Sequence, residues 1–165
     1  MSVQPIVESL ESITKLHESL LSLSIEKTEC LKAGDTEKLQ ALLLKERKHV
    51  QAINQMEEKR QQIVQIWSES NNVPTDKATV TGMLERMEDP QDKLDLESHF
   101  LKLTNVLVEL KQQEKLNQEL TKQSLQFIEI SIDMMDPSLK NMNYGNTSQA
   151  KSQQTNKRSL FDSKA

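Results

Sequence analysis

The chain has 165 residues, of which 35% are hydrophobic and 3% aromatic, so it has the length of one domain but little material for a thick globular core. Its three glycines and four prolines exclude most folds that need tight turns or glycine-rich phosphate loops. The net charge is −4, and five basic residues with one acid give the last 28 residues a charge of +4, which leaves −8 for residues 1–137. An acidic body of this kind is a poor nucleic-acid binder.

The first predicted helix covers residues 5–33, where apolar residues recur at steps of three and four. Gly34 should end this helix, and the Asp35 side chain should cap the next one by accepting hydrogen bonds from its free N–H groups. Because the turn is short, we expect the two helices to run antiparallel.

The second predicted helix covers residues 36–70 and stops before Pro74, which cannot continue it. Its apolar residues are assigned to one stripe, comprising Leu39, Leu42, Leu43, Val50, Ile53, Met56, Ile63, Val64 and Trp67. A short helix is expected within residues 75–88, although Gly82 weakens it.

The third long helix should start at Asp89-Pro90 and run to about Met135, before Asp136-Pro137. At 1.5 Å per residue it would be about 69 Å long, against about 43 and 52 Å for the first two helices. If it begins where the second helix ends, its extra length projects past the Gly34 turn.

The predicted fold class is therefore all-α. We expect an antiparallel bundle of three long helices with one short connecting helix over residues 1–137. Residues 138–165 should form a flexible, disordered basic tail that ends in a short Leu-Phe-Asp motif.

Two apolar stripes are predicted on the third long helix. The first should pack on the other long helices and comprises Leu96, Phe100, Leu103, Leu107 and Leu110. Glu114, Asn117 and Thr121 then interrupt it, and it returns as Leu125, Ile128, Ile132 and Met135. The second stripe comprises Leu116, Leu120, Phe127, Ile130 and Met134. The last turns of this helix are thus apolar on two faces.

An apolar patch left uncovered commonly marks a partner surface. The predicted partner-binding residues are Leu116, Leu120, Leu125, Phe127, Ile128, Ile130, Met134 and Met135. There are two alternatives to a partner surface. In one, the protein self-associates through this patch, and in the other, its own tail or short helix covers the patch. In the tail, Tyr144, Leu160 and Phe161 are candidates for docking to other machinery, or for a displaceable cover.

No catalytic or metal-binding constellation is visible. The three histidines, His17, His49 and His99, fall on three different predicted helices and lack a second ligand at metal spacing. Cys30 has no flanking base and cannot form an intramolecular disulfide. We therefore expect no enzymatic activity, metal or cofactor. Without a membrane-spanning run or a signal peptide, we expect a soluble, cytoplasmic protein without stable membrane insertion.

The chain resembles the FlgN family of flagellar export chaperones over nearly its full length. The residues that carry the resemblance are LSLSIEKTECLKAGD at 21–35, followed by Leu39, Leu42, Leu43 and Glu46. They continue with LNQEL at 116–120, LQFI at 125–128, Asn143-Tyr144-Gly145, and the terminal LFDSKA.

This resemblance implies a cytosolic chaperone that binds the hook-filament junction proteins FlgK and FlgL and delivers them to the flagellar type III export apparatus. It also implies that clients bind the carboxyl-terminal helical part, which agrees with the doubly apolar stretch. The alternative is a homo-oligomeric coiled-coil scaffold without a secreted client.

Overall fold

The computed structural model describes residues 2–135, and this part of the chain is helical with no strand. It contains α1 (Gln4–Ala33), α2 (Thr36–Ser70), the 3-10 helix η1 (Thr75–Lys77), α3 (Val80–Arg86) and α4 (Pro90–Met135). The all-α prediction is confirmed. The chain divides into two units, Met1–Leu120 and Thr121–Ala165, so α4 belongs to both. The predicted tail, residues 138–165, lies outside the described residues.

The helix ends follow the local chemistry of the sequence. Gly34 adopts a left-handed conformation (φ 68°), and its N–H bonds to the carbonyl of Cys30. The Asp35 carboxylate then accepts a 3.0 Å hydrogen bond from the Lys38 N–H at the start of α2. At the start of α4, the Asp89 carboxylate accepts a 2.7 Å bond from the Gln91 N–H. The predicted helix starts at these two places are confirmed.

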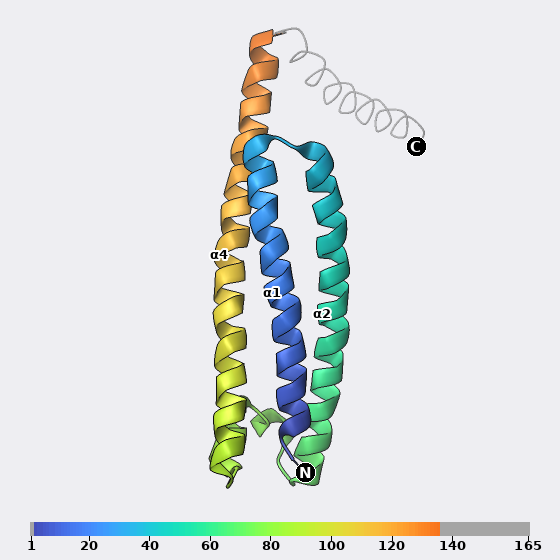
Figure 1. Cartoon of the computed structure of the whole chain (residues 1–165), viewed down its shortest axis with the longest axis vertical. Coiled ribbons are helices and arrows are strands. Elements are labelled where there is room, and N and C mark those ends of the chain that lie inside the picture. Colours follow the sequence, from blue (N-terminus) through green and yellow to red (C-terminus); the bar gives the residue numbers. More distant parts are fainter. Residues whose placement is uncertain (1, 136–165) are drawn as a thin grey trace, which may run out of the picture. The chain divides into compact units, whose positions relative to one another are not determined.

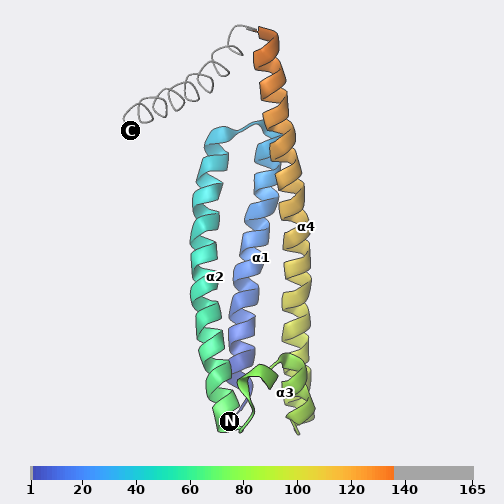
Figure 2. The same ribbon diagram turned by 180° about the vertical axis from the view of Figure 1, so that it is seen from behind.

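In the first unit, α1 lies between α2 and residues 90–120 of α4 (Figures 1 and 2). On one side of α1, Ser19 Oγ lies 2.8 Å from His49 Nε2 of α2. On another side, Glu18 pairs with Lys102 of α4 at 3.1 Å. The segment with η1 and α3 connects α2 to α4 near the amino terminus (Figure 2).

An apolar core occupies the end of the first unit that holds the amino terminus. It joins α1, the end of α2, α3 and the start of α4, and its buried members are Val3, Ile6, Val7, Leu10, Trp67, Val73, Met83 and Leu96. The short helix α3 contributes Met83, which is 2% exposed. The connecting segment is thus held by burial of its own apolar side chain.

Near the Gly34 turn the apolar core is thinner. Its buried members are Leu23 and Cys30 of α1 and Leu42 of α2, with Leu39 packed against them. No residue of α4 belongs to this cluster. At this end, side-chain hydrogen bonds and ion pairs between α1 and α4 take the place of apolar packing.

Asn117 of α4 is the centre of these hydrogen bonds and is only 2% exposed. Its side-chain oxygen accepts a 2.6 Å bond from Thr28 Oγ1, and its amide nitrogen donates to the Ser24 carbonyl at 2.9 Å. Gln113 donates to Thr28 Oγ1, and Ser24 Oγ donates to Glu114 at 2.5 Å. Buried polar groups are costly unless paired, and these are paired across the two helices.

Lys27 of α1 connects all three long helices. Its Nζ lies 2.7 Å from Glu46 of α2 and 3.0 Å from Glu114 of α4. The Lys27 side chain is 11% exposed. Burial acts to lower the pKa of Lys27, but the hydrogen bonds and charges of the two carboxylates outweigh it and raise the pKa. Lys27 is therefore charged inside the bundle.

The predicted packing stripe of α4 is wrong in part. Leu96 is buried and Leu103 and Leu110 are half-buried, but Phe100 and Leu107 are exposed. The buried face is completed by Val106 and by the partly buried His99 and Gln113. His99 and Gln113 are polar, so the pattern of apolar residues did not include them. The predicted stripe was therefore placed on the face beside the one that packs.

The same error affects α2. Leu42 and Trp67 of the predicted stripe are buried, whereas Leu43 and Val50 are exposed. Glu46, which pairs with Lys27, takes an inward position near Leu42. The prediction from apolar spacing therefore missed Glu46, because this residue of the packed face is polar.

Candidate functional site

The described part of the second unit is residues 121–135 of α4, the orange end of the ribbon in Figure 1. It carries a set of exposed large apolar side chains that we call the distal apolar surface, formed by Leu125, Phe127, Ile128, Ile130, Ile132, Met134 and Met135. Phe127 is 70% exposed and Met135 is 86% exposed. Such a density of exposed apolar groups exceeds the scattered single residues of an ordinary surface.

The surface has two parts on opposite sides of the helix. At about 100° per residue, Leu125, Ile128, Ile132 and Met135 form one stripe, and Phe127, Ile130 and Met134 form a second stripe centred about 150° away. We call these the leucine stripe and the phenylalanine stripe. Together with the gap between them they span about 220° of the helix circumference.

Different side chains separate the two stripes on each side. On the narrower side lie Ser124 and Ser131, and the Ser131 hydroxyl donates a 2.8 Å bond to the Phe127 carbonyl. The wider side is polar and carries Lys122, Gln126, Glu129 and Asp133. The wider polar side gives the helix one face suited to water, and the two stripes with the serines between them form the rest of its circumference.

Six of the predicted partner-binding residues belong to the distal apolar surface. Ile132 also belongs to the surface but was not among the predicted partner-binding residues. Its spacing of four residues from Ile128 places it on the leucine stripe. The two other predicted residues belong to the first unit, where Leu116 is exposed and Leu120 is half-buried. Tyr144, Leu160 and Phe161 lie outside the described residues.

Chemically, the distal apolar surface can bind but has no reactive group. Removing one large apolar side chain from water contributes about 1.5–3 kcal/mol before the costs of association. Its two methionines have flexible thioether side chains that adapt to different apolar shapes. Helical partners with apolar faces are the ligands that fit such a surface.

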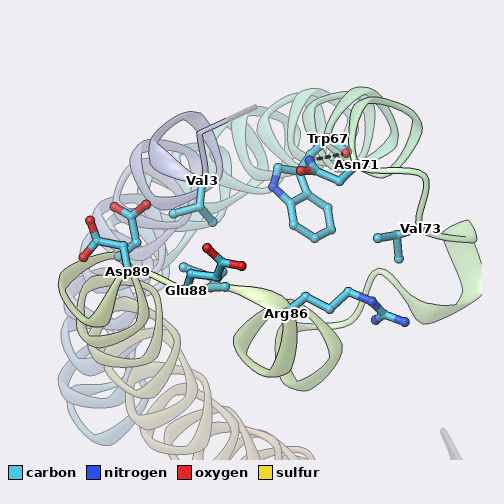
Figure 3. Close-up of a pocket in the computed structure, with 9 residues that line it drawn as sticks. Val3, Trp67, Asn71, Val73, Arg86, Glu88 and Asp89 are labelled. Carbon is cyan, nitrogen blue, oxygen red and sulfur yellow. Dashed lines mark hydrogen bonds between the residues drawn. The ribbon is translucent and has the colours of Figure 1, made fainter.

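A pocket of about 290 Å³ lies at the end of the first unit that holds the amino terminus (Figure 3). It is lined by Val3, Trp67, Asn71, Val73, Arg86, Met87, Glu88, Asp89 and Asp92. Three of its polar groups have local structural roles: Arg86 donates to the Gly82 carbonyl, Asp89 caps α4, and Asn71 donates to the Trp67 carbonyl. No motif or spacing in the sequence indicated this pocket, which lies where helix ends meet.

The histidines bond to their own helices. A ring nitrogen of His17, His49 and His99 in each case lies 2.8–2.9 Å from the carbonyl oxygen four residues earlier. Within residues 2–135, no three His, Cys, Asp or Glu side chains are grouped to hold a metal ion. Cys30 is buried in the thinner apolar core.

None of the helices between Gln4 and Met135 combines the length and apolar character needed to cross a membrane.

Comparison with known proteins gives two matches. The model of the FlgN protein family matches residues 1–152. A protein of Bacillus subtilis (strain 168), named uncharacterized protein YvyG, is 40% identical over 168 aligned residues, which cover 100% of both chains. No solved structure matches the chain.

Proposed function

Since the chain belongs to the FlgN family of flagellar export chaperones, we propose that it binds the unassembled hook-filament junction proteins FlgK and FlgL. It holds them in the cytoplasm and delivers them to the flagellar type III export apparatus. FlgN is a family of chaperones and not of enzymes, so the work is done by binding alone.

The observation that carries the proposal is the distal apolar surface, with its seven exposed large apolar residues. A client subunit bound there buries these side chains together with its own assembly-prone apolar face. Occupation of that face lowers the concentration of subunits free to polymerise, and it requires no ATP. Leu116 and Leu120, earlier on α4, extend the proposed client-binding set.

In this proposal the three long helices form an antiparallel bundle that supports the client-binding helix. Residues 1–137 act as the bundle domain, and residues 138–165 act as its basic tail. Tyr144, Leu160 and Phe161 of the tail dock to the export apparatus or cover the client surface. Removal of residues 159–165 separates these roles, because loss of a cover tightens client binding, whereas loss of a docking segment reduces secretion alone.

The test of the proposal is a pull-down of FlgK and FlgL with a double variant, Phe127→Asp with Ile130→Asp. Both side chains are exposed, so the variant should keep the helicity of the native chain. We expect it to lose client binding, because two carboxylates would be buried against an apolar client face.

The matched control is Leu94→Asp with Leu101→Asp, which changes two exposed apolar residues in the first unit's part of α4. This control should retain both clients. Unchanged retention of FlgK and FlgL by the Phe127→Asp, Ile130→Asp variant contradicts the proposal. Light scattering of the native chain tests the alternative scaffold: a stable oligomer that binds neither client favours it.

A further inference from the structure

The distal apolar surface is too wide for one partner helix. A helix that packs on a single neighbour needs an apolar stripe about 100° wide, whereas the two stripes here, with the gap between them, span about 220°. A helix docked on the leucine stripe would leave Phe127, Ile130 and Met134 in water, and these are 70%, 55% and 79% exposed. A single-helix occupant therefore accounts for only about half of the surface.

Two other occupants fit less well. The chain beyond Met135 has few large apolar residues, namely Leu139, Met142, Tyr144, Leu160 and Phe161, and only Leu139 and Met142 have helical spacing. This segment can cover part of the distal apolar surface but not all seven of its side chains at once. A second copy paired through one stripe leaves the other stripe uncovered on both copies.

We propose that the distal apolar surface takes two amphipathic helical segments of one client molecule, one on the leucine stripe and one on the phenylalanine stripe. This inference rests on the proposed chaperone function. Each segment presents apolar residues at steps of three and four, matching Ile128 and Ile132 on one side and Ile130 and Met134 on the other.

The serines between the stripes agree with this arrangement. Ser124 and Ser131 are seven residues apart and lie on the strip that faces neither segment directly. Serine side chains are short, so they project less from the helix than the apolar side chains on either side. The Ser131 hydroxyl donates a hydrogen bond to the Phe127 carbonyl of its own helix. The two client segments therefore bind on either side of a narrow hydrophilic strip.

Site-directed photocrosslinking tests the inference. The photoreactive residue p-benzoylphenylalanine replaces Ile128 in one variant and Ile130 in another, and purified FlgK or FlgL is the probe. We expect the two positions to label two different helical segments of the client. The same residue at Leu94, an exposed position of the first unit, serves as the control and should label neither segment.

Affinity measurements give a second readout. Ile128→Asp and Ile130→Asp each alter one stripe only, and each should weaken client binding at least tenfold because both segments contribute. Labelling of one and the same client segment from both positions overturns the inference, as does full affinity in either single variant. Failure of the native chain to bind FlgK and FlgL overturns the proposed function itself, and the inference with it.

Discussion

Replacement of Lys27 by methionine tests the polar connection between the three long helices. Methionine keeps the unbranched length of the side chain but removes the charge. Glu46 and Glu114, both within 3.0 Å of the Lys27 Nζ, would then face each other without a cation. The Glu46 side chain is only 14% exposed, so water can compensate little of that loss.

The magnitude follows from burial. Removal of one partner from a buried ion pair costs about 3–5 kcal/mol. The Glu114 side chain is 37% exposed, and solvent screens its share of the interaction. For Lys27→Met we therefore expect a loss of about 2–3 kcal/mol in the free energy of unfolding, or about 8–12 °C in Tm for a unit of this size.

Urea unfolding followed by far-UV circular dichroism measures this loss as a lower midpoint with unchanged slope. The triple variant Lys27→Met, Glu46→Gln, Glu114→Gln should recover most of the stability, because no uncompensated charge remains. Lys15→Met is the control on the same helix, since its pair with Glu11 is exposed on both sides and should leave the midpoint unchanged. A single variant as stable as the native chain, or a triple variant no better than the single one, refutes the reasoning.

Two further predictions concern stability. Gly82→Ala should lower the unfolding midpoint in urea, because the alanine Cβ would clash with the Lys77 backbone carbonyl. The clash should outweigh the higher helix propensity of alanine. A raised midpoint contradicts this prediction. The Arg60 hydrogen bond lowers the pKa of Glu57 from 4.5, so this pair stabilises the fold above that pH and the contribution disappears as the pH falls through the lower folded pKa. Glu57→Gln should therefore reduce the acid sensitivity of Tm, and an unchanged pH profile of Tm contradicts this second prediction.

The boundaries of the helices were predictable because short-range chemistry determines them. Gly34 with Asp35, and Asp89 with Pro90, mark helix ends through backbone conformation and capping bonds within three residues. No information from distant parts of the chain is needed. The predicted boundaries therefore agree with α1, α2 and α4 to within about two residues.

The packed faces were less predictable because polar residues occupy them. His99 and Gln113 are partly buried on the packed face of α4, and Glu46 takes the corresponding place on α2. Hydrophobic periodicity treats such residues as solvent-facing and shifts the predicted stripe to its neighbour. The bond between Thr28 and Asn117 joins residues 89 positions apart, and no local pattern in the sequence indicates it.

The candidate site was predictable to a different degree. The spacing of Leu125, Ile128, Phe127 and Ile130 indicated two apolar faces, and these side chains are exposed in the structure. Binding of a client to them stays a prediction, because periodicity and exposure describe a surface and not its ligand. The serines between the stripes were not used as a signal, although their spacing of seven was readable.

The distribution of residues along α4 is the reverse of what the hydrophobic effect favours in an isolated chain. Asn117 is polar and buried, whereas Phe127 and Met134 are apolar and exposed. Asn117 is held by its bonds to Thr28 and Ser24, whereas the exposed apolar side chains gain no burial energy in the free protein. The exposed apolar residues gain stability only when a partner covers them, so the sequence of α4 fits a helix whose most stable state is a complex.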